Sequence, residues 1–537
     1  MSNQQRPLGA QISHMLKARG VDTIFGIPGV HNTELYRGIE EAGITHVLGR
    51  HEQGVGFMAD GYARATGKPG VAYVITGPGL CNIMTPMGQA YSDSVSMLVI
   101  SSCLNAADNG IGRTRLHEML DQEGAAATVC EWSKTALDAD TAFQLVDRFF
   151  TEQEVSRHRP KHIQLPIEVL GGMASPAPDQ GQLPVRMGAS ISQVQPLIDM
   201  LKQAKQPVFI FGGGARGGQG SDQHDIYRDL LTKTGAASFT TYAGRGIVDP
   251  SDPLHFGSHL VRTDTARILG MADLVVIVGS ELSQTDIYRD DLGYLGAMVR
   301  IDIDPAVLAG SNRATMQIQA DAQAHLGAVA EGLCSEDAAS GWNVDEVAAA
   351  RSRWRLECSS ERPGTLEMIE AMKQALPEDT MFFSDMTQFA YVAKEVVPME
   401  RSGHWHHPFG FGTLGYALPA AIGGKIGIGD QPVVAIMGDY GFHYTMQELG
   451  VAVELGLSIP IILWDNGKLQ EIEDSMVRSQ IAPNAVIAQN PDFCALARAF
   501  GAGAVQPATI EEFKQALVDA LSADGPTMIY LTPECGR

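Results

Sequence analysis

The chain has 537 residues, of which 45% are hydrophobic and 19% are charged. This balance excludes a disordered chain and leaves room for about three domains with sizeable cores. A formal net charge of −23 argues against a nucleic-acid-binding surface, and no stretch approaches the ~20 apolar residues that a membrane span needs.

The start of the chain and its cysteines favour a cytoplasmic protein. Residues 1–6, which read MSNQQR, lack the pattern of a signal peptide. The seven cysteines are scattered, odd in number and without the spacing of a metal site. We therefore expect reduced thiols, which are typical of the cytoplasm.

Residues 1–172 are predicted to form the first domain, because short apolar strands alternate there with helical patterns. The strands are expected at 71–76, 97–102 and 162–165. Such alternation is typical of a parallel α/β sheet. A segment rich in Pro, Ala, Gln and Gly follows at 173–184 and is predicted to be a linker.

Several motifs of this first domain place polar residues beside glycines. The segment RHEQG at 50–54 leads into MADGYARATG at 58–67. The first expected strand then ends in TGPG at 76–79, and a polar loop, LHEMLDQE, follows at 116–123. Ligands of α/β proteins bind at the carboxyl ends of strands, so these motifs are candidates for a site.

Residues 185–334 are predicted to form a middle domain of the same class, with strands at 208–211, 274–278 and 299–303. A polar stretch rich in Ser, Glu and Ala, at 335–364, leads out of it. The last domain is predicted to follow this stretch.

The glycine turn of the middle domain raises one alternative function. Residues 212–218 read GGGARGG and contain G-x-G-x-x-G after a strand, a pattern typical of nicotinamide dinucleotide sites. A single match of this kind is a weak signal. An NAD-dependent oxidoreductase therefore stays an alternative, which an assay for a nicotinamide-linked absorbance change would test.

Residues 365–537 are predicted to form the last domain, and two of its strands end in residues suited to a metal ion. Asp439 follows the strand at 432–437 within the motif GDYGF, and Asn466 follows the strand at 459–464. Neighbouring parallel strands end at the same edge of a sheet. A carboxylate and an amide oxygen there suit a hard cation, and such a cation suits a diphosphate.

Together these motifs resemble those of thiamine diphosphate enzymes of the acetohydroxyacid synthase and pyruvate decarboxylase group, over the whole chain. The family's diphosphate motif is written G-D-G, a long spacer and N-N; here Tyr440 replaces the last Gly and Asp465 the first Asn. The resemblance implies an α/β fold of three doubly wound parallel-sheet domains, named pyrimidine, middle and diphosphate. It also implies a homodimer or homotetramer, with each site between two chains.

The resemblance implies thiamine diphosphate and Mg²⁺ as cofactors. Asp439 and Asn466 match the family's metal ligands, and the backbone carbonyl of Lys468 matches the next one. Tyr440 and Gly441 match positions beside the diphosphate. Synthases of the group hold FAD in the middle domain through an arginine-rich segment that residues 279–286 lack, so FAD is not expected.

The resemblance also implies how the rest of the cofactor is held. Glu52 matches the glutamate that hydrogen-bonds the pyrimidine ring and promotes proton removal from thiazolium C2, which needs a carboxyl group in a dry pocket. The carbonyl of Gly412 matches an acceptor for the pyrimidine amino group, and Leu414 the apolar residue that keeps the cofactor bent. Thr387 and Gln388 match a loop beside the phosphates.

Substrate contacts are expected from two segments. Gln122 matches an active-site glutamine of the synthase branch, and His117 is expected to reach the same pocket. Beyond the metal turn, Gln470 and Glu471 are expected to face the substrate, with Asp474 one helical turn from Gln470. The alternative for this segment is a solvated acidic helix face.

The function implied is decarboxylation of a 2-oxo acid, with the thiazolium ring as electron sink. Within the group, the turn GIPGVH at 26–31, the LHEM loop and the missing FAD pattern favour the 2-ketoarginine (5-guanidino-2-oxopentanoate) decarboxylases. Two alternatives remain: an acetolactate synthase-like carboligase, and a relative that binds thiamine diphosphate without turnover.

Overall fold

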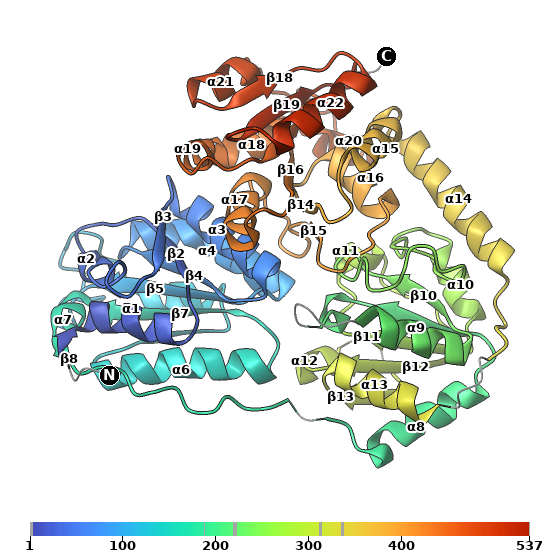
Figure 1. Ribbon diagram of the computed structural model, residues 1–537, viewed down its shortest axis with the longest axis horizontal. Helices are drawn as coiled ribbons and strands as arrows, with labels where there is room; N and C mark the ends of the chain where they lie inside the picture. Colours follow the sequence, from blue (N-terminus) through green and yellow to red (C-terminus); the bar gives the residue numbers. More distant parts are fainter. Residues whose placement is uncertain (1–3, 187, 218–222, 311–313, 334–337, 536–537) are drawn as a thin grey trace. The chain divides into compact units, whose positions relative to one another are not determined.

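The computed structural model describes residues 4–186, 188–217, 223–310, 314–333 and 338–535. Its strands form three large sheets with helices packed around them, together with one two-stranded ribbon (Figure 1). The predicted class, an α/β protein with three parallel sheets, is confirmed. No helix of the described segments is long and apolar enough to cross a bilayer.

The N-terminal sheet runs in the order β3-β2-β4-β5-β7-β6, with every neighbouring pair parallel. Its strands are β2 (Thr23–Gly26), β3 (Thr45–Leu48), β4 (Gly70–Val74), β5 (Met97–Cys103), β6 (Trp132–Thr135) and β7 (Pro160–Pro166). The order reverses between β2 and β4, because β3 lies on one side of β2 and the later strands lie on the other. Ligands of such sheets bind at this switch point, so the loops after β2 and β4 are placed to form a site.

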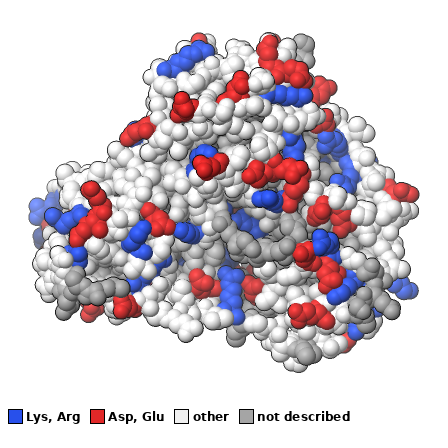
Figure 2. Space-filling view, viewed as in Figure 1, with Lys and Arg blue, Asp and Glu red and all other residues white. Residues whose placement is uncertain are grey.

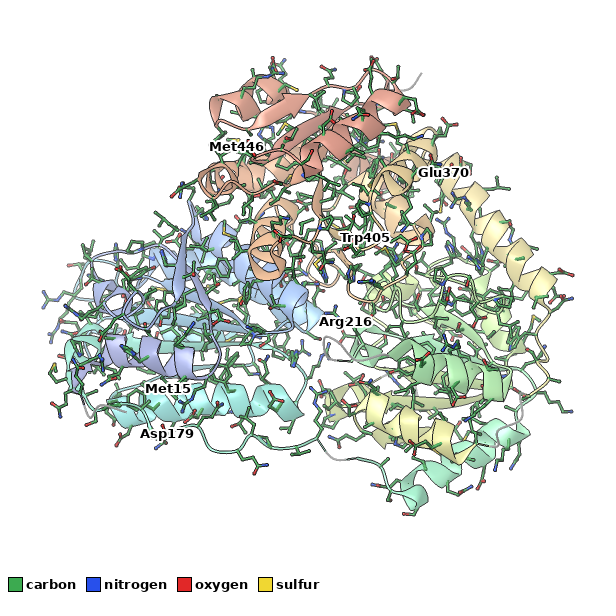
Figure 3. The ribbon with its side chains drawn as sticks, viewed as in Figure 1. Met15, Asp179, Arg216, Glu370, Trp405 and Met446 are labelled. Atoms are coloured by element: carbon green, nitrogen blue, oxygen red, sulfur yellow. The ribbon has the colours of Figure 1, made fainter. Side chains whose placement is uncertain are left out.

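Helices surround this sheet and bury its apolar faces. They are α1 (Leu8–Ala18), α2 (Thr33–Tyr36), α3 (Glu52–Thr66), α4 (Pro78–Asp93), α5 (Gln122–Ala127), α6 (Ala139–Val155) and α7 (Ile167–Gly171). Met15 of α1, labelled in Figure 3, belongs to the core between these helices and the sheet. Of the predicted linker, Met173–Ala174 form a short strand, β8, which pairs antiparallel with β1 (Arg6–Pro7).

The middle sheet is wholly parallel and runs in the order β10-β9-β11-β12-β13. Its strands are β9 (Pro207–Phe211), β10 (Ala237–Thr240), β11 (Leu274–Val278), β12 (Ala297–Asp302) and β13 (Met316–Gln319). The accompanying helices are α8 (Ile191–Gln203), η1 (Gly213–Ala215), α9 (Gln223–Thr234), α10 (Thr265–Met271), α11 (Gln284–Ile287), α12 (Pro305–Leu308) and α13 (Ala322–Gly332).

The polar stretch at 335–364 contains a helix that sequence patterns did not predict. Helix α14 (Val344–Glu361) buries Val347, Ala350, Trp354 and Cys358, whose spacing of three and four residues makes one narrow apolar stripe. Trp354 packs beside Phe239 and Phe256 in the core of the middle sheet. The helix was not predicted because polar residues on its other faces outnumber the four residues of the apolar stripe.

In the C-terminal sheet, five strands follow one another in the order β14-β16-β17-β19-β18. The strands are β14 (Met381–Ser384), β16 (Val433–Gly438), β17 (Pro460–Trp464), β18 (Gly503–Val505) and β19 (Thr527–Leu531), and β15 is Trp405–His406. The helices of this part are α15 (Thr365–Ala375), α16 (Gln388–Val396), α17 (Ala417–Ile428), α18 (Asp439–Thr445), η2 (Met446–Glu448), α19 (Leu449–Glu454), α20 (Gln470–Arg478), α21 (Phe493–Ala499) and α22 (Ile510–Leu521).

By compactness the chain divides into two units. One comprises Met1–Val185, Phe382–Thr387 and His407–Arg537, and therefore holds both the N-terminal sheet and nearly all of the C-terminal sheet. The other comprises Arg186–Met381 and Gln388–His406. The predicted domain boundaries, at 1–172, 185–334 and 365–537, stay a prediction.

Within the first unit, helices α3 and α17 pack with their backbones in direct contact. A Cβ added at Gly61 would lie 2.0 Å from the carbonyl oxygen of Ala420, and one added at Gly423 would lie 1.9 Å from that of Met58. Only glycine fits at such distances. This contact joins the N-terminal sheet to the C-terminal one.

Candidate active site

Glu52 is the first residue of α3, and its side chain is only 9% exposed. The helix start is capped by His51, whose Nδ1 accepts a hydrogen bond from the backbone N–H of Gln53 at 3.1 Å. The Glu52 Oε2 atom accepts a hydrogen bond from Nδ2 of Asn82, in α4, at 2.9 Å. The carboxyl group is therefore largely shielded from water, and within the described residues a neutral amide binds it.

The glycine turn after β4 lies against Glu52. A Cβ added at Gly79 would lie 3.3 Å from Oε1 of Glu52, and one added at Gly77 would lie 2.5 Å from the carbonyl oxygen of His117. Gly77 also has a φ of +70°, which disfavours other residues. The turn thus brings Glu52 and the loop that holds His117 together at the switch point of the sheet.

His117 meets a second histidine, His31, from the loop after β2. The two ring centroids lie 4.8 Å apart, with an angle of 67° between the ring planes. The Nδ1 atoms of both rings are buried and accept or donate no hydrogen bond within the described residues. Burial of the ring, and then the charge of His117, lower the pKa of His31 below its usual 6.5, so that it is mainly neutral at pH 7.

Sequence patterns predicted His117 as a site residue but missed His31. In the sequence, the turn at 26–31 indicated only the branch of the family to which the chain is similar. His31 lies directly after β2, beside the reversal of strand order, and this position is the signal that would have identified it as a site residue.

Gln122 is 2% exposed, and its amide is bonded to other protein groups on both sides. Its Oε1 accepts from the N–H of Gly77 at 2.9 Å, while its Nε2 donates to the carbonyl oxygen of Ser102 at 2.9 Å and to Oε1 of Gln164 at 2.9 Å. In this arrangement Gln122 holds the glycine turn in place. Contact with a substrate would require one of these bonds to be exchanged.

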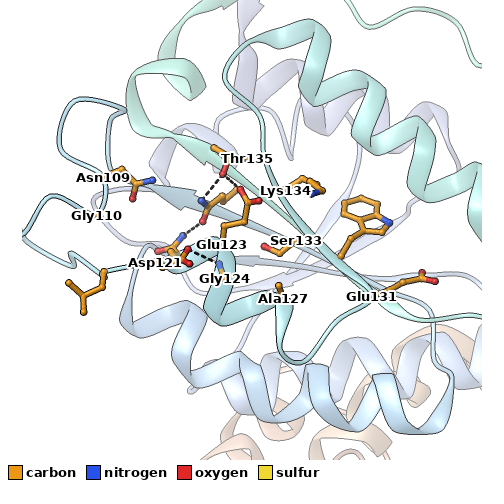
Figure 4. Close-up of a pocket in the computed structure, with 14 residues that line it drawn as sticks. Asn109, Gly110, Asp121, Glu123, Gly124, Ala127, Glu131, Ser133, Lys134 and Thr135 are labelled. Atoms are coloured by element: carbon orange, nitrogen blue, oxygen red, sulfur yellow. Dashed lines mark hydrogen bonds between the residues drawn. The ribbon is translucent and has the colours of Figure 1, made fainter.

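A cavity of about 520 Å³ lies beside Gln122 and is lined by α5, by β6 and by part of the preceding loop (Figure 4). The acidic side chains Asp121, Glu123 and Glu131 and the basic Lys134 surround it. All three acids are already engaged. Oδ1 of Asp121 accepts from the N–H of Gly124 at 2.7 Å, Glu131 pairs with Nζ of Lys161 at 2.7 Å, and Oε2 of Glu123 accepts from the hydroxyl of Thr135.

The predicted metal ligands lie where two neighbouring strands end. Strands β16 and β17 are parallel, and Gly438 lies opposite Trp464, so Asp439 and Asp465 leave the sheet side by side. The amide of Asn490 bridges them: its Nδ2 donates to Oδ2 of Asp439 at 2.8 Å and to Oδ1 of Asp465 at 2.9 Å. Sequence patterns had not singled out Asn490.

Charge at this edge fits a bound cation. Burial, and then the neighbouring charge of Asp465, raise the pKa of Asp439 above its usual value. A divalent ion would relieve the repulsion between the two carboxylates. Within the described residues, no group of three or more His, Cys, Asp and Glu side chains could hold a metal. The predicted ligand set does not depend on such a group, because it combines the Asp439 carboxylate with the amide oxygen of Asn466 and the carbonyl of Lys468.

The turn after β17 is built by its own polar residues. Oδ1 of Asp465 accepts from the N–H of Gly467 at 2.8 Å, and Oδ1 of Asn466 lies 3.3 Å from the backbone nitrogen of Lys468. Gly467 has a φ of +69°. Oδ2 of Asp465 also accepts from the hydroxyl of Tyr530 at 2.9 Å, so the residue that departs from the family motif holds the turn.

The loop that carries Gly412 and Leu414 is held by α4. Oδ1 of Asp93 accepts from the N–H of Gly410 at 2.8 Å, and Oε1 of Gln89 accepts from the hydroxyl of Thr413 at 2.9 Å. Gly412 is exposed, with a φ of +67°, and Leu414 is half-buried. The loop is thus held in a defined conformation, with Gly412 open to solvent.

The remaining predicted cofactor residues surround Asp385, which sequence patterns did not single out. This carboxylate is fully buried at the end of β14, and its Oδ2 accepts from the N–H of Gly415 at 2.7 Å. A Cβ added at Gly441 would lie 2.6 Å from the same Oδ2 atom, and one at Gly438 would lie 3.2 Å from Oγ1 of Thr387. Burial raises the pKa of Asp385 to about 6.

The two other predicted cofactor residues, Tyr440 and Gln388, lie in the first turns of helices. Tyr440, the second residue of α18, is half-buried, which leaves part of its ring at the surface. Gln388 is the first residue of α16 and belongs to the other compact unit, whereas Thr387 belongs to the first.

The predicted substrate segment forms α20, none of whose residues is buried. Nε2 of Gln470 donates to Oδ1 of Asp474 at 2.7 Å, so the expected spacing of one helical turn is confirmed. Glu471 forms an exposed ion pair with Arg478 at 3.2 Å, and Glu473 one with Lys468 at 2.5 Å. The acidic side chains of α20 are therefore partly neutralised, by Arg478 of the same helix and by Lys468 of the turn after β17.

Sequence models of one family match three segments of the chain. The N-terminal TPP binding domain of thiamine pyrophosphate enzymes matches residues 6–125, the central domain matches residues 194–329, and the C-terminal TPP binding domain matches residues 385–531.

Individual relatives cover nearly the whole chain. The probable 2-ketoarginine decarboxylase AruI of Pseudomonas aeruginosa is 38% identical over 98% of this chain and 94% of its own length. The acetolactate synthase isozyme 2 large subunit of Escherichia coli is 26% identical over 98% of this chain and 95% of its own length. The acetolactate synthase large subunit of Corynebacterium glutamicum is 28% identical over 98% of this chain and 86% of its own length. With these matches and the three sheets, the chain belongs to the thiamine pyrophosphate enzyme family.

Proposed function

We propose that the chain is a thiamine diphosphate-dependent decarboxylase of a 2-oxo acid, with 5-guanidino-2-oxopentanoate as its preferred substrate. The observation that carries the proposal is the 38% identity to the probable 2-ketoarginine decarboxylase AruI over almost the whole chain. The buried Glu52 at the switch point of the N-terminal sheet supports it. When bound, the cofactor supplies an electron sink for the electron pair left behind as carbon dioxide departs.

The residues around Glu52 are assigned roles on this basis. Glu52 hydrogen-bonds the pyrimidine ring, the carbonyl of Gly412 accepts from the pyrimidine amino group, and Leu414 supports the bend of the cofactor. His31 and His117 face the substrate and can pass a proton between their rings and the reacting group, because both have an Nδ1 atom that no described residue binds.

Asp439, the amide of Asn466 and the carbonyl of Lys468 are proposed to hold Mg²⁺. Oxygen ligands of this kind are those that Mg²⁺ prefers in proteins. Tyr440 and Gly441 then lie beside the diphosphate. Thr387 and Gln388 are proposed to line its other side, with Thr387 already packed against the end of β16.

Each site is proposed to lie between two copies of the chain, with Glu52 from one and Asp439 from the other, in a homodimer or homotetramer. Chains that carry Glu52→Gln and chains that carry Asp439→Ala are each expected to be inactive. When the two are unfolded together and refolded, random pairing should restore about one quarter of the wild-type activity, because half of the dimers are mixed and each has one intact site. Carbon dioxide release measures the recovery.

Wild-type chains refolded in the same way provide the reference, and either variant refolded by itself provides the background. Activity that stays at background after mixing, with the dimer present by sedimentation, would mean that Glu52 and Asp439 of one chain serve the same site.

The acidic face of α20 is proposed to recognise the guanidinium group of the substrate. A bidentate pair with a carboxylate contributes roughly 1.5–3 kcal/mol, which corresponds to about a tenfold to hundredfold preference over 2-oxohexanoate. Glu471 pairs with Arg478 at the exposed surface of the helix, where a guanidinium group of the substrate can compete with Arg478 for the carboxylate. We expect Glu471→Gln to remove most of the preference in kcat/KM.

Glu511→Gln is the matched control, because Glu511 is an exposed acid in α22 that pairs with Lys514. It should keep the preference for the guanidino substrate. If pyruvate is the better substrate of the wild-type protein, or if Glu471→Gln keeps the margin, α20 is a solvated face and does not select the substrate.

The acetolactate synthase relatives favour one second candidate, a carboligase that joins the decarboxylated fragment to another carbonyl compound. Product analysis with pyruvate distinguishes the two, since a carboligase yields acetolactate and a decarboxylase yields acetaldehyde. Absence of carbon dioxide release from a panel of 2-oxo acids would instead support a relative without turnover.

A further inference from the structure

A carboxylate far from Glu52 in the chain binds the backbone directly in front of it. Glu448, the last residue of η2, is completely buried. Its Oε1 accepts from the N–H of His51 at 2.9 Å, and the N–H of Arg50 lies 3.1 Å from Oε2 and 3.2 Å from Oε1. Met446, labelled in Figure 3, marks the start of this short helix.

The two N–H groups that Glu448 binds precede α3, where the helix itself offers no acceptor. A buried N–H group without a partner would be costly, so the carboxylate satisfies donors that the N-terminal domain leaves open. The fit is close: a Cβ added at Gly54 would lie 2.4 Å from both Cδ and Oε1 of Glu448. Glycine at position 54 is therefore required for the carboxylate to reach the helix start.

This contact fixes the backbone of the two residues in front of Glu52. The direction in which the Glu52 side chain leaves the helix depends on where α3 begins. Glu52 has one other described restraint, the hydrogen bond from Asn82. Movement of the helix start would turn the Glu52 carboxyl group away from its partner.

We propose that Glu448 is a positioning residue, which holds the start of α3 so that Glu52 meets the pyrimidine ring of the cofactor. This inference rests on the proposed role of Glu52. It adds a link between the segment that begins with Asp439 and the acid–base group of the N-terminal domain, because η2 directly follows α18.

The test compares Glu448→Gln with the wild-type holoenzyme loaded with thiamine diphosphate and Mg²⁺. Gln places an NH₂ group against two N–H donors, so one of the hydrogen bonds is lost. We expect C2–H/D exchange of the bound cofactor and kcat to fall by about tenfold to hundredfold, since displacement of about 1 Å costs this much. The KM and the concentration of cofactor needed for half-saturation should stay within about twofold.

Glu454→Gln is the matched control, because Glu454 pairs with the Arg50 side chain, not with the backbone in front of α3, and lies at the exposed end of α19. It should behave as the wild type. Gly54→Ala disrupts the same contact by a steric clash, because the added Cβ would overlap the carboxyl group of Glu448. It should reproduce the effect of Glu448→Gln.

Hydrogen exchange of the protein without cofactor gives a readout that does not depend on activity. The amides of residues 50 and 51 should be protected in the wild type and should exchange at least tenfold faster in Glu448→Gln.

Burial is the largest cause and raises the pKa of Glu448 to about 7. The hydrogen bonds from the backbone N–H groups of Arg50 and His51, and the charge of Arg50, lower the pKa but do not offset the burial. Glu454, which pairs with the Arg50 side chain, is a further charged group near this contact. Because the pKa of Glu448 rises from its usual 4.5 on folding, the folded protein binds a proton at this carboxyl group more tightly than the unfolded chain does. The stability that this proton contributes is fully present below pH 4.5 and is lost as the pH rises through about 7. The non-titrating Gln variant should show a flatter pH dependence of Tm over this range.

If Glu448→Gln exchanges C2–H at the wild-type rate, or if both variants lose the fold, Glu448 is not a positioning residue and its role is purely structural. These outcomes differ from failure of the proposed function, in which the wild-type protein itself would show no C2–H/D exchange and no carbon dioxide release.

Discussion

Exchanging Glu52 for Gln should leave thiamine diphosphate bound while turnover falls by about two to four orders of magnitude. Gln has the same size and can still form a hydrogen bond, but it cannot give up or take a proton. The buried position of Glu52 at the start of α3 makes replacement by solvent inefficient. The rates of C2–H/D exchange and of carbon dioxide release measure the loss.

Glu41→Gln provides the control, because Glu41 is an exposed acid of the same domain that pairs with Arg6. Its exchange rate should equal that of the wild type. Near-normal exchange in Glu52→Gln would remove Glu52 from its proposed role, even if cofactor binding were intact.

Asp439→Ala should abolish the stabilisation that thiamine diphosphate and Mg²⁺ together give the protein. A ligand present at 100 times its Kd stabilises the folded state by about 2.7 kcal/mol, which a thermal melt detects as a rise in Tm. Without Asp439, the predicted ion retains only amide and carbonyl oxygens from the chain. We expect no rise in Tm with cofactor and Mg²⁺, the same result that the wild type should give with a chelator.

The matched control is Asp519→Ala, which removes an exposed carboxylate from α22 in the same part of the chain. It should keep the full rise in Tm. An unchanged response in Asp439→Ala would show that the cofactor is held without this carboxylate and would contradict the assigned metal site.

Strands buried on both faces were predictable from the sequence, because they read as continuous apolar runs. Strand β11 covers Leu274–Val278, the residues predicted. The short edge strands β6, β13 and β18 were not predicted, since each has only three or four residues, at least one of them exposed, and therefore lacks a continuous apolar run. The apolar stripe of α14 was not predicted for a related reason, because its four buried residues are spread over the eighteen residues of the helix.

For the site, local geometry could be predicted and distant partners could not. The sequence predicted that the strands before Asp439 and Asn466 end at one edge, and β16 and β17 are indeed neighbouring parallel strands. The Gln470–Asp474 pair follows from helical spacing. The contacts of His31 and Glu448 depend on which distant segments meet, and local periodicity carries no such information.

The distance along the chain between α3 and its partners has a consequence for synthesis. Arg50 and Glu448 are 398 residues apart. At 5–20 residues per second a ribosome needs about 20–80 s to cover that interval. For most of this time α3 has been synthesised, but α17, which begins at Ala417, has not. The first domain of each new polypeptide therefore waits, incompletely covered, for the last part of its own translation, and chaperones that bind nascent chains have that interval in which to act.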